Sequence, residues 1–318
     1  MLKVSIDAQL PEHTLYYYMR SGKPTTFEWV DNLDTFTASR EKPDLFILAL
    51  ENKFSQERIQ QRISAGHKFL LYMESSFWLT DYCTPEFIQA LDQQPLLLGV
   101  CSHTKKTLDE FATLLPSKPR FHVPVGVPRQ SQDYWHREDG DPITFLFWGS
   151  HNDKEQKAWK DRGGQLVCDL FIRLHTKYHC KMILRAPRDA DLISKAVWPD
   201  DVEMYHDYLP SGQLADIHHR SDVLLLPSSK AHFISVPYAA SFGIPTVGLE
   251  HWALRELIED GVNGIIAKDF DDLVDRCSKL PGLLPALSRG ALESQRRDHD
   301  CENYPQRWAS VFQQLGLT

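Results

Sequence analysis

The stretch that decides the fold lies at residues 221–267 and reads SDVLLLPSSKAHFISVPYAASFGIPTVGLEHWALRELIEDGVNGIIA. Its apolar run Val223–Leu226 predicts a buried strand that ends in a proline-serine turn. A helix is expected at about Tyr238–Phe242, and Gly243 ends it before a second strand at Thr246–Leu249. A strand, a helix and a second strand in this order are typical of a parallel sheet covered by helices.

Similar apolar runs occur along the whole chain, separated by polar segments with helical spacing. In the first half they cover Leu2–Ile6, Leu45–Leu48, Phe69–Tyr72, Leu96–Val100 and Phe121–Val125. In the second half they cover Ile143–Trp148, Lys181–Leu184, Val202–Tyr205, Val223–Leu226, Thr246–Leu249 and Gly264–Ala267. Helices are expected at Ser55–Ala65, Pro85–Leu91, Thr104–Leu115, Gly164–Thr176, Tyr238–Phe242 and Arg307–Leu315. The pattern predicts an α/β protein with two Rossmann-like domains.

Residues 129–142 between the two halves are polar, flanked by prolines and without periodicity, which is the composition of a linker. We therefore expect an N-terminal domain at 1–128 and a second domain at 129–295. The C-terminal segment 296–318 is expected to form a helix that crosses back to the first domain.

Composition excludes several classes of protein. The net charge of −8 argues against a broad nucleic-acid surface, because such a surface needs clustered lysine and arginine. The six cysteines are far apart and include no CxxC pair, so neither a zinc knuckle nor a disulfide framework is expected. No apolar stretch reaches the ~20 residues that span a bilayer, and the N-terminus lacks a signal peptide pattern. A cytoplasmic protein is the expectation.

Basic residues follow the strand at 143–148. After Gly149 and Ser150 the chain carries Lys160 and Arg162 immediately before Gly163-Gly164 and a predicted helix. In such sheets, ligands bind beyond the carboxyl ends of the strands, where helix N-termini attract phosphate. This loop is therefore a candidate phosphate site, although a solvated charged loop is the alternative interpretation.

Three spaced motifs give a family resemblance. Residues 226–228 (LPS), 243–245 (GIP) and 256–264 (ELIEDGVNG) keep the order and spacing of the C-terminal signature of family 4 glycosyltransferases. Upstream, Phe147-Trp148-Gly149 and Arg162-Gly163-Gly164 resemble the first C-domain strand of that family and its basic loop. The resemblance covers about Cys101–Ala267, and the first hundred residues match only as a generic Rossmann half.

The resemblance implies a GT-B architecture, in which two Rossmann-like domains face each other across a cleft. The first domain would bind the acceptor and the second the nucleotide-diphosphate sugar. The expected activity is that of a metal-independent, retaining hexosyltransferase in glycan biosynthesis, which needs no cofactor and acts on a glycan, lipid or protein acceptor. A non-catalytic GT-B subunit that has lost donor turnover is the alternative, and an epimerase or hydrolase on the same fold is a further one.

The resemblance also assigns roles to residues. Arg162 and Lys160 would neutralise the leaving diphosphate, as the catalytic cations of such enzymes do. Glu74, which follows the strand Phe69–Tyr72, would contact the acceptor sugar, or else it caps the next turn. The donor-binding residues are expected to be Gly149, Ser150, Arg185, Lys230, His232, Phe233, Ile234, Ser235, Tyr238 and Glu256, with no metal ligand.

One departure concerns the paired glutamates of the family, which lie eight positions apart. Counting back from Gly243 places them on Lys230 and Tyr238, and neither is acidic. Weaker or altered donor binding is implied. A basic patch in the first half leaves peripheral contact with anionic lipid headgroups open; it comprises Lys105, Lys106, Lys118 and Arg120.

Overall fold

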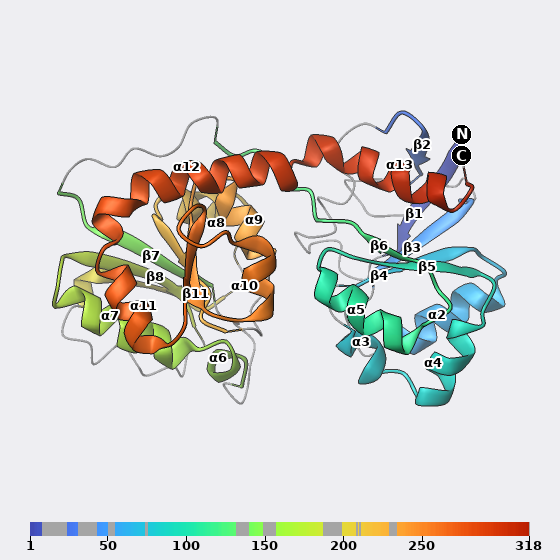
Figure 1. Cartoon of the computed structure of the whole chain (residues 1–318), viewed down its shortest axis with the longest axis horizontal. Coiled ribbons are helices and arrows are strands. Elements are labelled where there is room, and N and C mark those ends of the chain that lie inside the picture. The colour runs from blue at the N-terminus through green and yellow to red at the C-terminus, as the bar shows by residue number, and fades with distance from the viewer. Residues whose placement is uncertain are drawn as a thin grey trace. The chain divides into compact units, whose positions relative to one another are not determined.

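The computed structural model describes residues 1–7, 24–30, 43–49, 55–73, 76–131, 140–148, 157–186, 199–207, 209, 211–228 and 234–317. They form two compact units, one made of Met1–Pro128 with His299–Thr318 and the other of Arg129–Asp298. Each unit contains a six-stranded parallel sheet covered by helices (Figure 1). The predicted α/β class with two Rossmann-like units is confirmed.

The sheet of the first unit has the strand order β2-β1-β3-β4-β5-β6. Its strands are β1 (Leu2–Asp7), β2 (Phe27–Trp29), β3 (Leu45–Ala49), β4 (Phe69–Tyr72), β5 (Leu97–Ser102) and β6 (Arg120–His122). The helices of this unit are α2 (Ser55–Ser64), α3 (Phe77–Thr80), α4 (Pro85–Asp92), α5 (Lys105–Leu114), the 3₁₀ turn η2 (Cys301–Asn303) and α13 (Tyr304–Gln314).

The first sheet is buried on both faces, which explains why its strands are almost wholly apolar. On one face, Leu48 and Leu71 pack with Ile59 of α2 and Phe111 of α5. On the other face, the last helix of the chain supplies the cover: the Trp308 ring of α13 lies 5.8 Å from the Tyr72 ring of β4. The C-terminal helix is thus part of the core of the first unit.

The sheet of the second unit has the strand order β12-β11-β10-β7-β8-β9. Its strands are β7 (Ile143–Trp148), β8 (Cys180–Arg185), β9 (Val202–Tyr205), β10 (Val223–Leu225), β11 (Thr246–Leu249) and β12 (Gly264–Ala267). Its helices are α6 (Lys157–Asp161), α7 (Gly164–His175), the 3₁₀ turn η1 (Pro199–Asp201), α8 (Ser211–His219), α9 (Ser235–Ala240), α10 (Trp252–Leu257), α11 (Phe270–Cys277) and α12 (Leu280–Asp298). In Figure 1, α7 and α11 lie together on one side of this sheet and α8 and α9 on the other.

Several elements differ from the sequence prediction for local chemical reasons. The strand expected at Phe121–Val125 ends at His122, because Pro124 has no N–H to donate to a ladder. The last helix begins at Tyr304, three residues before the predicted start, because Pro305 occupies its first turn, where no N–H partner is needed. Strand β2 was not predicted, since it has only three residues. All six cysteines are free thiols, as expected.

Candidate functional site

The strand order of the second sheet reverses between β7 and β10, which are adjacent although two strands separate them in sequence. Strands β8 and β9 extend the sheet on one side of β7, and β11 and β12 extend it on the other side of β10. Such a reversal opens a crevice at the carboxyl ends of the two strands, where ligands bind in doubly wound sheets. We therefore located the candidate site at the loops that follow β7 and β10.

These two loops touch. Gly163, the residue before α7, has a φ of +80°, and a Cβ placed on it would lie 2.9 Å from Cγ of Pro227, just after β10. The Ser228 hydroxyl donates a hydrogen bond of 2.5 Å to the carbonyl oxygen of Asp161. Two of the motifs that carried the family resemblance, 162–164 and 226–228, are thus brought together.

The N-terminus of α7 has two features that favour an anion. Gly163 provides no side-chain cap, and the first turn contains no acidic residue, so the first N–H groups of the helix keep their capacity to bind a negative group. Gly164 is required here because a Cβ would lie 2.2 Å from the buried Trp159 ring. Of the two predicted cations beside this terminus, Arg162 is half-buried and Lys160 is exposed.

Arg185 ends β8, next to the switch point. It pairs in register with Trp148, the last residue of β7, and its guanidinium carbon lies 5.1 Å from the centre of the Trp148 ring. Only 8% of Arg185 is exposed. The stacking contact holds a buried positive charge at the carboxyl edge of the sheet.

His251 lies at the same edge and was not singled out by the sequence. It follows β11 and caps α10, where its Nδ1 accepts a hydrogen bond of 3.4 Å from the Leu254 N–H. Burial lowers the pKa of His251, and the backbone of Leu226 partly opposes that shift. The imidazole is therefore neutral at pH 7. A histidine two residues after a predicted strand was the available signal.

The remaining described donor candidates belong to α9 and α10. Ile234 and Ser235, which open α9, are half-buried. The Tyr238 ring is only 6% exposed and packs edge to face against His218, with 4.7 Å between ring centres. Glu256 is exposed on α10. The structure therefore places Tyr238 among core rings and Glu256 on the surface.

Six of the predicted residues lie outside the described residues, and the structure provides no position for them. They are Glu74, Gly149, Ser150, Lys230, His232 and Phe233.

A charged cluster lies at the switch point of the first sheet, between β1 and β3. Asp7 ends β1, and its carboxylate accepts hydrogen bonds from Arg58 at 2.8 Å and from Arg62 at 2.5 Å. Arg58 also donates to the carbonyl oxygen of Ala49, at the end of β3. Burial raises the pKa of Asp7, but the two guanidinium groups outweigh it and lower the pKa overall. The cluster thus holds a permanent ion network at this edge.

His103 is buried at the end of β5. Neither of its ring nitrogens has a hydrogen-bond partner among the described residues. Burial, together with the nearby rings of His299 and His122, lowers its pKa to about 3. His103 is therefore neutral at physiological pH.

None of the helices in the described part of the chain combines the length and the apolar composition needed to cross a bilayer.

Comparison with known proteins reveals similarity in structure and not in sequence. Neither a protein-family model nor a curated protein sequence matches the chain. HepE from Anabaena, solved in complex with UDP, matches with a TM-score of 0.70 and 10% identity over 99% of this chain and 100% of that chain. The lipopolysaccharide outer core galactosyltransferase WaaB matches with a TM-score of 0.66 and 12% identity, again over 99% and 100%.

A third match is the sucrose-phosphate synthase from Thermosynechococcus elongatus, with a TM-score of 0.64 and 12% identity over 86% of this chain and 74% of that chain. These matches agree with the two parallel sheets covered by helices described above. The chain therefore has the GT-B fold, built from two Rossmann-like units.

Proposed function

We propose that the chain is a glycosyltransferase that moves a sugar from a nucleotide-diphosphate sugar to a glycan, lipid or protein acceptor. One observation carries the proposal. The turn that holds Arg162 packs on the turn that holds Ser228, at the switch point of the second sheet. Three of the solved structures with this fold are complexes of HepE with UDP, with UDP and glucose, and with UDP-glucose. We place the nucleotide diphosphate of this chain at the two packed turns of this switch point.

The chemistry of transfer explains why cations are needed there. As the glycosidic bond breaks, negative charge grows on the leaving diphosphate, and groups already fixed around it lower the barrier. Arg162 and Lys160 stand beside the N-terminus of α7, and Arg185 is held by Trp148 at the adjacent strand end. We assign these three cations and the first N–H groups of α7 to the diphosphate.

We further propose a retaining, metal-independent reaction. The assigned arginines and lysine can neutralise the leaving diphosphate. In other transferases a divalent metal ion performs this role. Turnover is therefore expected to persist in the presence of a chelator.

A second candidate function is that of a non-catalytic GT-B subunit. The observation that favours it is the position of Tyr238, one of the two residues that stand where the resembled family has glutamates. Its ring is buried against His218 and Phe242. A phenol group is uncharged, so it cannot replace a carboxylate as a charged hydrogen-bond acceptor for hydroxyl groups of the donor. A binding partner without turnover would tolerate that change.

The test is a thermal-shift screen of UDP, GDP, ADP and their sugars on the full chain, since a ligand that binds only the native state raises the melting temperature. We expect one nucleotide family to stabilise the wild type and to lose at least tenfold in affinity with Arg162→Ala or Arg185→Ala. Arg173→Ala is the matched control, because Arg173 is an exposed arginine on α7 whose partner, Asp271, lies away from the switch point. No stabilisation by any nucleotide would overturn the donor site.

A second measurement distinguishes the glycosyltransferase from the non-catalytic subunit: the rate at which free nucleotide is released from the nucleotide sugar that stabilises the chain. We expect the release rate to rise when acceptor extracts are added. Binding of the donor without any release, with or without extract, would favour the non-catalytic subunit.

A further inference from the structure

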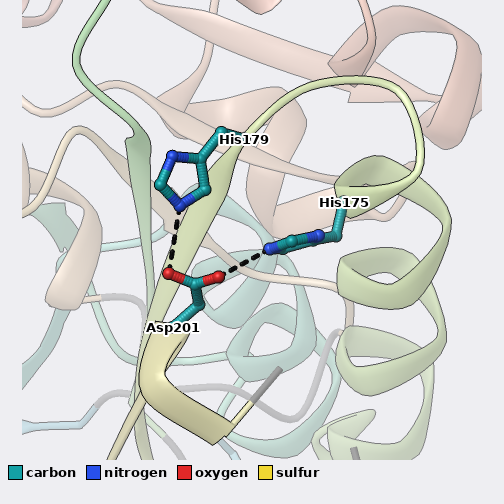
Figure 2. A group of neighbouring side chains, drawn as sticks. All are labelled: His175, His179 and Asp201. Atoms are coloured by element: carbon teal, nitrogen blue, oxygen red, sulfur yellow. Dashed lines mark hydrogen bonds and ion pairs between the residues drawn. The ribbon is translucent and has the colours of Figure 1, made fainter. Parts of the chain in front are cut away.

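Three side chains that can bind a metal meet at the amino-terminal edge of the second sheet, opposite the candidate donor site. His175 is the last residue of α7, His179 precedes β8, and Asp201 ends the 3₁₀ turn before β9. The Asp201 carboxylate lies between the two imidazoles, 2.8 Å from Nε2 of His175 and 3.1 Å from Nε2 of His179 (Figure 2). The three ligand atoms all lie within 4.8 Å of one another.

The cluster is held by its surroundings. The backbone N–H groups of Lys177 and Tyr178 both donate to the carbonyl oxygen of Leu174, at 2.8 and 3.1 Å, which fixes the turn between the histidines. The Tyr178 hydroxyl donates to the carbonyl oxygen of Cys277 at 3.0 Å and so ties the same turn to α11. The histidines are therefore presented by a rigid turn, as a metal site requires.

The exposure of the three groups suits a site that opens to solvent. The side chains of His175 and Asp201 are 10% and 17% exposed, whereas that of His179 is 57% exposed. A cation placed among them would be reached from the side of His179 and would keep room for water as a fourth ligand. Three protein ligands with one open position is a common zinc arrangement.

We infer that His175, His179 and Asp201 form a binding site for a divalent transition metal of the zinc type. Two imidazole nitrogens and one carboxylate oxygen suit zinc, cobalt or nickel, whereas magnesium and calcium prefer oxygen ligands alone. The metal would replace the hydrogen bonds that now join the two Nε2 atoms to the carboxylate. It would link the end of α7 to the starts of β8 and β9, at the edge of the sheet opposite the donor loops, so its role is to stabilise the second unit.

The experiment is a titration of the metal-stripped full chain with ZnCl₂ by calorimetry, with CoCl₂ absorption as a second readout of ligand geometry. We expect one saturable site in the wild type, a rise in melting temperature, and the visible bands of four- or five-coordinate cobalt. Asp201→Asn and His179→Ala are each expected to weaken zinc binding by at least tenfold and to abolish the cobalt bands.

Two matched variants control for nonspecific binding. Asp200→Asn removes the exposed carboxylate next to Asp201 in the sequence, and His219→Ala removes another exposed histidine of the same unit. Both are expected to bind zinc as the wild type does. Circular dichroism of His179→Ala confirms folding, since this side chain is mostly exposed. Equal zinc affinity in the wild type, Asp201→Asn and His179→Ala would overturn the site and leave only a hydrogen-bonded histidine-aspartate-histidine cluster.

Discussion

The hydroxyl of Ser228 donates a 2.5 Å hydrogen bond to the carbonyl oxygen of Asp161. The two residues are 67 positions apart in sequence, and they join the turn before α7 to the turn after β10. Both turns flank the switch point of the second sheet, so this hydrogen bond holds the turn that carries Arg162, a proposed diphosphate ligand, against the end of β10.

Ser228→Ala removes this hydrogen bond. We expect a loss of about 0.5–1.5 kcal/mol in the free energy of unfolding. We also expect weaker nucleotide binding than in the wild type, because the turn that carries Arg162 is no longer held in place. Urea unfolding and calorimetry measure the two quantities. Ser278→Ala, which removes an exposed hydrogen bond from Ser278 to Asp275, should leave nucleotide affinity at the wild-type value. Equal affinities in all three proteins would contradict the positioning role.

Gly163→Ala tests the turn itself. The φ of +80° strains any residue with a Cβ, and here the Cβ would lie 2.9 Å from Pro227. The left-handed conformation alone costs about 1–2 kcal/mol, so we expect at least that loss in stability by urea unfolding. Gly212→Ala is the control, because no atom lies within 4 Å of a Cβ at that position of α8. It should be neutral or slightly stabilising, and a similar loss in both variants would contradict the prediction.

His218 makes stability depend on pH. Its pKa falls from 6.5 to about 4 because its ring is buried, while a hydrogen bond to Leu214 opposes the shift and His219 adds to it. Above about pH 6.5 the imidazole is neutral in both the folded and the unfolded chain. As the pH falls from 6.5 to about 4, only the unfolded chain binds the proton, so stability drops by on the order of 3 kcal/mol.

The variant His218→Phe keeps an aromatic ring against Phe242, from whose ring centre that of His218 is 5.2 Å away, but cannot titrate. Its free energy of unfolding, measured in urea from pH 7.5 to pH 4, should fall less steeply than that of the wild type. His219→Ala, which removes only the smaller contribution of this neighbour to the lowered pKa of His218, should reduce the slope less than His218→Phe does. His103 is present in every one of these proteins, so its contribution to the pH dependence of stability is the same in all of them and cancels in the comparison. Parallel curves for wild type and His218→Phe would rule out the assignment.

Trp308→Ala tests the contribution of the C-terminal helix to the first unit. The ring is fully buried and packs on Tyr72 and Phe312. Removal of a buried aromatic side chain costs about 3–5 kcal/mol, which urea unfolding followed by circular dichroism should reveal. Gln313→Ala changes an exposed position of the same helix and should stay within about 0.5 kcal/mol of the wild type. A loss below about 1 kcal/mol for Trp308→Ala would contradict this packing.

Local patterns predicted most of the strands. Runs such as Phe69–Tyr72 and Thr246–Leu249 have the bounds that were expected, because a strand buried on both faces must be apolar at every position. The start of the last helix was harder to predict: the helix was expected from Arg307, but it begins at Tyr304 with Pro305 in its first turn. The three-residue strand β2 is too short to show a hydrophobic pattern in the sequence. It forms because it pairs with the neighbouring strand β1.

The sequence by itself determined the α/β class, the two Rossmann-like halves and the glycine turns beside the predicted phosphate loop. These features follow from periodicity and backbone sterics, which act between residues close in the chain. Only the tertiary structure decided which distant side chains meet. It placed the Ser228 hydroxyl against the Asp161 carbonyl, the Arg185 guanidinium over the Trp148 ring, and Asp201 between His175 and His179. Strand order and loop paths set such contacts, and both depend on the packing of the whole chain.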